Sequence, residues 1–482
     1  MDDRPHDGAI QLNRTGGYRR WWWLGLLPLL ATLGCNGPRD RLARFDHLYT
    51  QGDWNGAWTC VQEVPEPGNP PKGNDLLWAL QRATVQRELQ DYQTSNQWFD
   101  RAEDMMKYYD LGSKALDGVG STLVNENTIP YRGSTYDGIM VNTYKALNYM
   151  ALGRDDAARV EFNRAVERQR RARERFNAEI QREKAENDEK KTNKSVDYDK
   201  TLNNDATEDK IRAKYAGLYE FEAYPDFVNP FATYIAGIFF TMIDDPDKAI
   251  DLLKESAGMV GSNQTIMDDF AGVDQWLSEG KPIPPCVWVI YENGVGPIKE
   301  EFRVDLPLYL VSKDVYYAGI ALPKLTPRSR ATRDLAVKSG ETWVRTEEVA
   351  DMDRVIQTEF AKIFPGILTR ALISAAAKVV MQDTLTDRGG MGGQLMGLAA
   401  AIYSQVTTAA DCRIWTSLPK DFQVARVPMP KDPQLQIRLD GGEPREVSIP
   451  ACRYALVYVK KVAAGADPVI EVMTRGTDVT KK

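Results

Sequence analysis

The residue types that enzymes commonly use for acid–base and nucleophilic catalysis are few and poorly arranged in this sequence. Its two histidines, His6 and His47, have no serine or cysteine motif beside them, so a catalytic triad would lack its base. Ser-x-x-Lys spacings occur at Ser278–Lys281 and Ser417–Lys420, but a glycine or a proline interrupts the helical turn that would bring each lysine to its serine. We therefore expect that the protein is not an enzyme.

Two further patterns suggest chemistry without meeting its requirements. The glycine-rich run 389–393 lacks the Gly-Lys-Ser/Thr ending of a phosphate-binding loop and does not follow a predicted strand. Glu300-Glu301 and Glu347-Glu348 are adjacent carboxylates, and adjacent residues on a strand point to opposite faces, so neither makes a glycosidase pair. The cysteine spacings are not those of a zinc site. We expect neither a cofactor nor a metal.

Cys35 is the residue whose setting predicts a covalent modification. Two arginines precede the apolar run 21–33, which is too short to span a bilayer and ends in a small residue directly before the cysteine. This order resembles a bacterial lipobox, in which a signal peptide, here residues 1–34, is removed and the cysteine is acylated. Three acyl chains, at about 0.8 kcal/mol per buried CH₂ group, would hold the protein on a membrane. An ordinary signal peptide or a single anchor helix is the alternative.

The residue after the cysteine predicts which membrane carries the protein. It is Asn36 and not the aspartate that is typical of inner-membrane retention. The sequence therefore predicts a lipid-anchored protein on the periplasmic face of the bacterial outer membrane, with residues 35–41 as a tether.

Four cysteines follow the predicted lipidation site. An oxidising periplasm would allow up to two disulfides among them, with three possible pairings. Buried thiols that pack as small hydrophobic groups are the other interpretation. The four are Cys60, Cys286, Cys412 and Cys452.

A short polar and aromatic motif, Asp411-x-Arg413-x-Trp415, precedes the last group of predicted strands. An arginine can form a forked pair with a carboxylate or stack on an indole, which would fix the chain at this point. We expect such structural locking, with a ligand site as the alternative.

The elements that must position these residues begin with the segment 136–165, which has the spacing of a tetratricopeptide unit. Gly153 marks a turn between two helical patterns, and small or aromatic residues lie at the expected distances on either side. Such a unit buries one stripe of each helix and leans on a neighbouring pair. The signature residues are Ala146, Tyr149, Gly153, Ala158, Phe162 and Ala165.

Weaker copies of this pattern predict a helical repeat domain over residues 42–281. The run 164–191 is charged on nearly every face, so we expect a solvated extension of the second repeat helix. The polar stretch 192–210 is expected to be mobile, and 164–210 together would form an extension of the domain.

A mainly β domain is predicted over residues 282–474, with residues 475–482 as a tail. Short β-branched and aromatic runs with turn residues between them suggest a sandwich or a partly closed barrel. An Ala/Gly-rich helical hairpin, 367–406, lies within an insertion at 349–406. Its first helix is expected to begin after Phe364-Pro365-Gly366, where a preceding helix ends. The fold class is thus α+β and multidomain.

Composition agrees with this organisation. The chain has 482 residues, of which 43% are hydrophobic, and this is ample for two or three packed domains. A net charge of −7 over this length does not indicate a nucleic-acid partner.

The order of the motifs resembles a family of uncharacterised bacterial lipoproteins with a tetratricopeptide-like N-terminal half. The most specific part is Asp411-x-Arg413-x-Trp415-x-x-Leu418-Pro419, followed by Gln423-x-x-Arg426-x-Pro428. The sequence departs from the family pattern at Cys412, where a polar residue is expected. The resemblance brings no activity and no functional residues. The chain also resembles proteins whose genes lie near those of envelope lipoproteins of the penicillin-binding-protein-activator and curli-export kinds. This resemblance implies a role in the cell envelope.

Two functions are favoured at this point, and an enzyme remains an alternative only if a pair of carboxylates converges in the fold. The first is a protein-binding scaffold in envelope assembly or secretion, in which the concave face of the repeats receives a helix or an extended peptide of one or more envelope proteins. The second is a structural subunit of an oligomeric export or appendage complex, assembled through the hairpin 367–406.

Overall fold

The computed structural model describes residues 38–116, 129–191, 194, 196–219, 221, 224, 229–311, 315–386 and 409–476. The chain divides into two units, Met1–Arg44 and Phe45–Lys482. The larger unit contains both the helical and the strand-rich parts, so the predicted boundary at residue 281 does not separate two compact units. Cys35, the signal segment 1–34 and the predicted helix 394–406 lie outside the described residues.

Four helix pairs with the same turn geometry lie in the described part of the chain before residue 281. In each pair a residue with positive φ stands two positions after the first helix, and the second helix begins two positions later. These residues are Gly52, Gln90, Gly153 and Asp244, with φ of 74°, 61°, 66° and 59°. The pairs are α1 (Pro38–Thr50) with α2 (Trp54–Gln62), α3 (Asp75–Glu88) with α4 (Tyr92–Leu116), α5 (Thr135–Ala151) with α6 (Asp155–Lys190), and α9 (Pro230–Met242) with α10 (Pro246–Val260).

The residue after each of these turns caps the second helix in three of the four pairs. The side chains of Asp53, Asp91 and Asp245 accept hydrogen bonds from backbone N–H groups three residues later, at 2.9, 3.0 and 3.3 Å. This bond satisfies one of the N–H groups that a helix start leaves without an intrahelical partner. The recurring turn and cap show that the pairs are copies of one helical unit.

The α5–α6 pair packs through the small residues that mark the repeat pattern. Ala146, Ala158, Phe162 and Ala165 are completely buried, whereas Tyr149 is half-buried. The Phe162 ring also reaches the next pair, where its centroid lies 5.0 Å from that of Phe239 in α9. The apolar stripe of one pair is thus covered by its neighbour, as a repeat array requires.

The strands form three sheets in the described residues. Five strands make a mixed sheet in the order β11-β10-β1-β7-β6, in which β1 and β10 are parallel. Four strands make an antiparallel sheet in the order β5-β4-β8-β9, and β2 and β3 form a long hairpin. The bounds are β1 Cys286–Asn293, β2 Ile298–Tyr309, β3 Val315–Thr326, β4 Leu335–Ser339, β5 Thr342–Arg345, β6 Glu347–Asp351, β7 Asp421–Pro428, β8 Gln434–Leu439, β9 Arg445–Ser448, β10 Tyr454–Lys461 and β11 Val469–Arg475.

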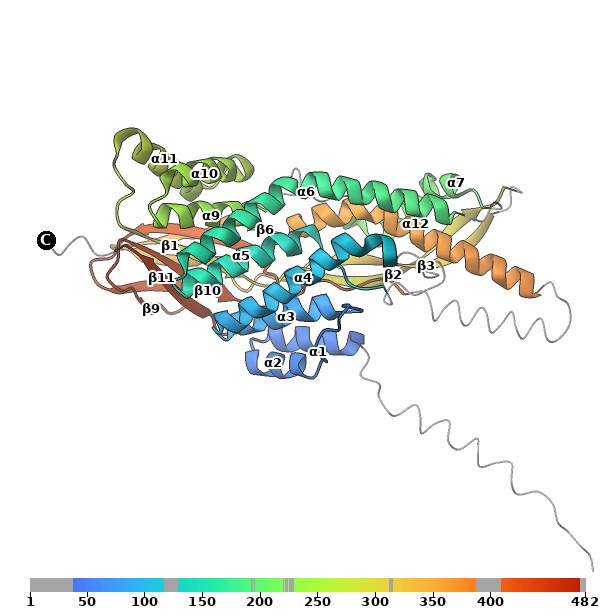
Figure 1. The fold of residues 1–482 in the computed structure, drawn as a ribbon, viewed down its shortest axis with the longest axis horizontal. Helices are drawn as coiled ribbons and strands as arrows, with labels where there is room; N and C mark the ends of the chain where they lie inside the picture. Colours follow the sequence, from blue (N-terminus) through green and yellow to red (C-terminus); the bar gives the residue numbers. More distant parts are fainter. Residues whose placement is uncertain are drawn as a thin grey trace, which may run out of the picture. The chain divides into compact units, whose positions relative to one another are not determined.

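The five-stranded sheet is buried on both faces. Side chains on one face of β1, β7 and β10 join those of β4, β8 and β9 in an apolar core, so the two larger sheets pack face to face as the predicted sandwich would. The opposite face of the sheet meets the repeat helices: Phe422 of β7 stacks on Phe231 of α9, with ring centroids 3.6 Å apart. Helix α11 (Gln264–Glu279) lies on the same face, where its Asp269 pairs with Arg426 of β7 at 2.5 Å. The five-stranded sheet therefore has helices on one face and the four-stranded sheet on the other; Figure 1 shows the helices and strands of this part of the chain.

The insertion differs from its prediction, because one continuous helix occupies the residues where two helices were predicted, one ending and one beginning at Phe364-Pro365-Gly366. α12 (Met352–Thr386) runs without interruption through Pro365. A proline inside a helix costs about 3 kcal/mol, but Phe360, Phe364 and Leu368 are buried along the same helix and offset this cost. The insertion also starts later than expected, since residues 347–351 form β6.

Part of α12 has the length and composition of a membrane span. This part is Met352–Ala377, and 44% of its most apolar window is buried inside the molecule. The helix contacts α5, α6, β3 and β7, which is the environment of a core helix in this fold.

The charged extension of α6 is not solvated on all sides. Its residues Ala172 and Phe176 are buried in a small cluster with Ile363 of α12, and Arg370 of α12 pairs with Glu183. Figure 1 shows the two long helices side by side. The predicted solvated extension is therefore exposed along most of its residues but packs on α12 through one apolar stripe.

Two other sequence-based boundaries also differ. The stretch expected to be mobile, 192–210, contains α7 (Tyr198–Leu202) and most of α8 (Asp205–Lys214). Both helices pack on β2, and Val196 forms an isolated bridge with Leu310. The predicted tether 35–41 overlaps α1, which begins at Pro38.

Candidate functional site

The sequence predicted partner binding on the face formed by the first helix of each repeat, and in three of the four pairs the chain itself covers that helix. Every residue of α9 is buried, as is every residue of α3 after Asp75 and nearly every residue of α5, whereas most residues of α1 are exposed or half-buried. The covering elements are strands of the five-stranded sheet and the segment 409–420. We call this contact region the repeat–sheet interface. The predicted open groove for a helix or peptide is absent from the described structure.

Trp415 is the central apolar anchor of the interface. Its side chain is 1% exposed, and its ring centroid lies 6.0 Å from those of both Phe99 in α4 and Tyr144 in α5. The indole N–H donates to the hydroxyl of Thr84 in α3 at 3.1 Å. A tryptophan that is fully buried with its N–H satisfied is a strong packing group.

Arg413 fixes the start of the same segment. Its guanidinium forms a forked pair with the Asp411 carboxylate, with N–O distances of 2.7 and 2.6 Å, and it donates to Asn74 Oδ1 at 3.1 Å. It also donates to the carbonyl of Ile129 at 2.8 Å. The guanidinium holds the pKa of Asp411 below its usual value, although burial acts in the opposite direction. These bonds join the segment to the repeat part, which is the structural role that the sequence favoured.

A buried ion cluster joins the sheet to α3. Lys460 of β10 lies between two carboxylates, 2.8 Å from Glu88 and 2.6 Å from Glu292 of β1. All three side chains are at most 3% exposed. The carboxylates also accept hydrogen bonds from buried phenols: Tyr49 donates to Glu88 at 3.1 Å, and Tyr144 donates to Glu292 at 2.8 Å.

The pKa shifts in the ion cluster follow from this geometry. Burial alone would lower the pKa of Lys460, but Glu292 and Glu88 outweigh it, so the pKa is raised and the ammonium stays charged. Burial raises the pKa of Glu88, and Lys460 opposes that shift. Burial and the nearby carboxylates raise the pKa values of Tyr49 and Tyr144 well above the usual range. The phenols therefore stay protonated and act as hydrogen-bond donors.

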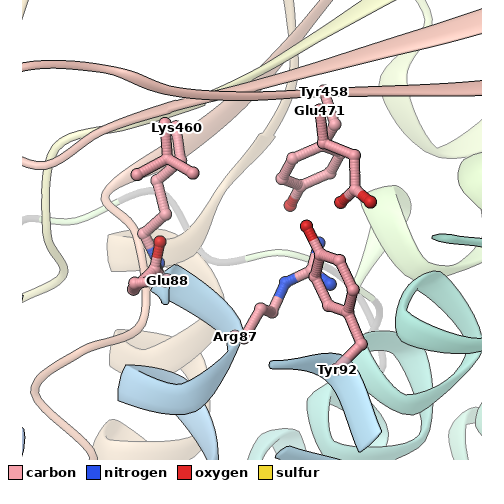
Figure 2. A pocket seen from close by; sticks show the side chains of 7 residues that line it. Arg87, Glu88, Tyr92, Tyr458, Lys460 and Glu471 are labelled. Atoms are coloured by element: carbon pink, nitrogen blue, oxygen red, sulfur yellow. The ribbon is translucent and has the colours of Figure 1, made fainter. Parts of the chain in front are cut away.

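A small pocket lies at the edge of the ion cluster, where Arg87 of α3 points between aromatic rings (Figure 2). The guanidinium carbon lies 5.0 Å from the ring centroid of Tyr458, 5.3 Å from Tyr144 and 5.9 Å from Tyr92. Tyr92 also hydrogen-bonds to Glu471 of β11. Arg87 also donates to the Asn148 side chain of α5, so we assign it to cation–π packing and hydrogen bonding within the chain.

The two Ser-x-x-Lys spacings do not bring their residues together in the described structure. Ser417 donates to Gln81, Lys420 pairs with Asp353, and Ser278 donates to the carbonyl of Asp274. Among the described residues, no group of three or more His, Cys, Asp or Glu side chains is placed to hold a metal ion.

The four cysteines are widely distributed in the described structure, and no disulfide joins any two of them there. Cys60 lies in α2, Cys286 begins β1, and Cys452 precedes β10; all three are buried, whereas Cys412 is half-buried. Burial raises the pKa of the Cys286 thiol, so it is a poor nucleophile in this state.

The ion cluster was not predicted from the sequence. Glu292 and Lys460 each directly follow an apolar run, 286–291 and 454–459, which is a weak signal on its own. The parallel pairing of β1 and β10, which places Glu292 directly opposite Lys460, is a long-range feature that local patterns do not reveal.

Comparisons with known proteins add little to this description. No protein-family model matches the chain, and no curated protein sequence matches it. Among solved structures, a tetratricopeptide repeat protein from Parabacteroides merdae is weakly similar: it is 14% identical, the match covers 48% of this chain and 97% of that chain, and the TM-score is 0.13. At that TM-score the similarity carries no argument, and the repeat character of the N-terminal half rests on its four helix pairs.

Proposed function

We propose that the protein is a non-enzymatic assembly component of the bacterial cell envelope, held on the outer membrane by a lipid on Cys35. It contacts other protein chains through the end of the β2–β3 hairpin. The proposal differs from a groove-binding repeat scaffold in where the partner sits. A partner in the groove would have to displace Trp415 and the ion cluster, and both are completely buried.

The observation that carries the proposal is a group of large apolar side chains exposed at the hairpin end. Val311 and Tyr317 are each 65% exposed, and Val315 is 45% exposed. The pairing of β2 with β3 places Val315 opposite Tyr309 and Tyr317 opposite Pro307, so the two β3 residues lie on one face. We call this group the hairpin tip. A concentrated exposed apolar patch is typical of a protein–protein or membrane contact.

Other exposed apolar side chains occur singly and do not compete with this assignment. Leu152 and Val160 flank the α5–α6 turn, Met267 and Leu277 lie on α11, and Tyr219 follows a short 3₁₀ turn. Isolated apolar side chains are normal on any protein surface. They provide control positions for the test of the hairpin tip.

Site-specific photo-crosslinking in intact cells tests the proposal. A photoreactive amino acid at Tyr317 should give discrete protein adducts in the membrane fraction, because this side chain would lie in a contact. The same probe at Leu152, which is 40% exposed but far from the hairpin along the chain, should give none. If Tyr317 gives no adduct, or if both positions give the same adducts, the hairpin tip is not a protein contact.

A further inference from the structure

The β2–β3 hairpin has two outer edges, and the chain treats them differently. The edge of β2 is covered near the tip by the segment that contains α7 and α8. The N–H of Tyr309 donates to Thr201 at 3.1 Å, its carbonyl accepts from the N–H of Asp197 at 2.8 Å, and Lys210 donates to the carbonyl of Asp305 at 2.8 Å. A further strand could not pair with this part of β2 without displacing those contacts.

Within the described part of the chain, no strand lies along the outer edge of β3, although Ala321 and Pro323 near its base are buried and Lys210 of α8 lies 4.5 Å from the ring centroid of Tyr317. In the described residues, β2 is the only strand that pairs with β3. The backbone N–H of Leu325 donates to Tyr215 at 3.2 Å, but this contact lies beyond Pro323, near the base of the hairpin. One face of β3 is covered, since Ala318, Ile320 and Leu322 are buried and α12 packs on the strand. The edge thus combines a supported face with backbone groups that can still form a ladder.

The composition of β3 is unusual for an open edge. Residues 315–323, Val-Tyr-Tyr-Ala-Gly-Ile-Ala-Leu-Pro, contain no charged side chain, whereas residues 299–305 of β2 contain five. Natural edge strands are normally protected by charges, prolines or bulges against pairing with another chain. In this hairpin the charged strand is β2, whose edge is already covered by α7 and α8. The edge of β3 has neither a charge nor a proline before Pro323.

We propose that β3 pairs antiparallel with β3 of a second copy of this chain about a two-fold axis, making a four-stranded sheet. This inference rests on the proposed function, because it names the occupant of the hairpin end. In a two-fold antiparallel pair, a residue before the axis lies opposite the residue at the same distance after the axis in the second copy. A strand with several charged side chains would therefore often place like charges opposite each other. The stretch 315–323 has no charged side chain.

Gly319 lies at the centre of this stretch and is exposed. In the proposed pairing, Gly319 faces Gly319 of the second copy, and Tyr317 faces Ala321. A glycine in a strand interior is typical of a site where another backbone approaches closely. Pro323, which has no N–H to donate, would end the ladder at both sides.

The test combines a mass measurement with a charge introduced at the centre of the strand. Full-length protein extracted in detergent should have the mass of a dimer by light scattering after subtraction of the detergent. Gly319→Lys should give a folded monomer with the circular dichroism spectrum of the wild type, because the two lysines would oppose each other only in the pair. Among the described residues, an added Cβ at this position lies close to one group, the Asp305 carboxylate, whose oxygen is 3.2 Å away.

A matched control makes the same change elsewhere. Gly258 of α10 is exposed and has nothing within 4 Å of an added Cβ, so Gly258→Lys should leave the dimer intact. Gly319→Cys should form a disulfide-linked dimer in intact cells, and Arg303→Cys on the exposed face of β2 should not.

Several outcomes would overturn the inference. A monomeric wild-type protein, a ring larger than a dimer, or a dimer or aggregate that Gly319→Lys does not disrupt would each exclude two-fold pairing through β3. If the wild type is monomeric while Tyr317 still crosslinks to a different protein in cells, this inference fails and the proposed function stands. If Tyr317 gives no adduct at all, both fail.

Discussion

Replacing Glu359 with glutamine should change how the stability of the protein depends on pH. Glu359 lies on α12, is 6% exposed, and accepts hydrogen bonds from the first backbone N–H groups of α5, from Thr135 at 2.9 Å and from Tyr136 at 3.4 Å. Burial raises its pKa to about 8, although these two bonds act to lower it. Asp137 stands nearby and contributes to the increase.

The sign of the effect follows from the difference between the folded and unfolded states. The unfolded chain releases the proton of Glu359 near pH 4.5, whereas the folded protein keeps it until about pH 8. Between these values the folded state binds more protons, so the free energy of unfolding falls as the pH rises. At 1.36 kcal/mol per pH unit, the loss over this interval is about 5 kcal/mol as an order of magnitude.

Glutamine keeps an acceptor for the α5 N–H groups and cannot ionise. We expect Glu359→Gln to match the wild type near pH 5 and to be more stable near pH 8.5, by up to the magnitude just given. Urea unfolding of the purified protein, followed by circular dichroism at several pH values from 5 to 9, measures the difference. The exposed Glu341 supplies the control, since Glu341→Gln should leave the wild-type curve unchanged. Parallel curves for the wild type and Glu359→Gln, or a variant that loses stability at high pH, would refute the reasoning.

Three further predictions test the packing and the anchor. Trp415→Ala should lower the free energy of unfolding by about 3–5 kcal/mol, measured by denaturant titration, because it empties the centre of the repeat–sheet interface; a loss below about 1 kcal/mol would contradict that placement. Ala158→Leu should lower the melting temperature through overpacking that costs about 1–3 kcal/mol, whereas Val160→Leu, at a 47% exposed position of the same helix, should not. Cys35→Ser should move the protein out of the membrane fraction or leave the signal uncleaved, and a processed, membrane-bound variant would exclude the lipid anchor.

The sequence predicted the helical half well where the signal was local. Gly153, the turn glycine predicted between the two helices of the segment 136–165, has the positive φ that such a turn requires. The turns at Gln90 and Asp244 adopt a positive φ without a glycine, so the geometry recurs more strictly than the residue type. Asp440 and Gly441 also have positive φ and stand between strands β8 and β9.

The errors arose where contacts between distant segments overruled local preference. Pro365 normally ends a helix, but α12 continues through it because the residues on either side are buried by other elements. The polar stretch 192–210 folds because β2 supplies a surface for it, and that surface is formed by residues about 100 positions later. Neither partner is visible from the composition of the segment itself.

The same long-range contacts explain why the repeat pattern alone does not locate a partner-binding surface. A repeat array needs something to cover the first helix of each pair, and the pattern does not say whether the cover comes from another protein or from the same chain. In this chain the cover contains Trp415, the Arg413–Asp411 pair and the Lys460 ion cluster. Removing one partner of a buried ion pair typically costs about 3–5 kcal/mol, so a competing peptide would have to compensate for several such losses at once. The repeats therefore act as an internal platform for the sheet, and we propose the unprotected edge of β3 as the place where another chain pairs.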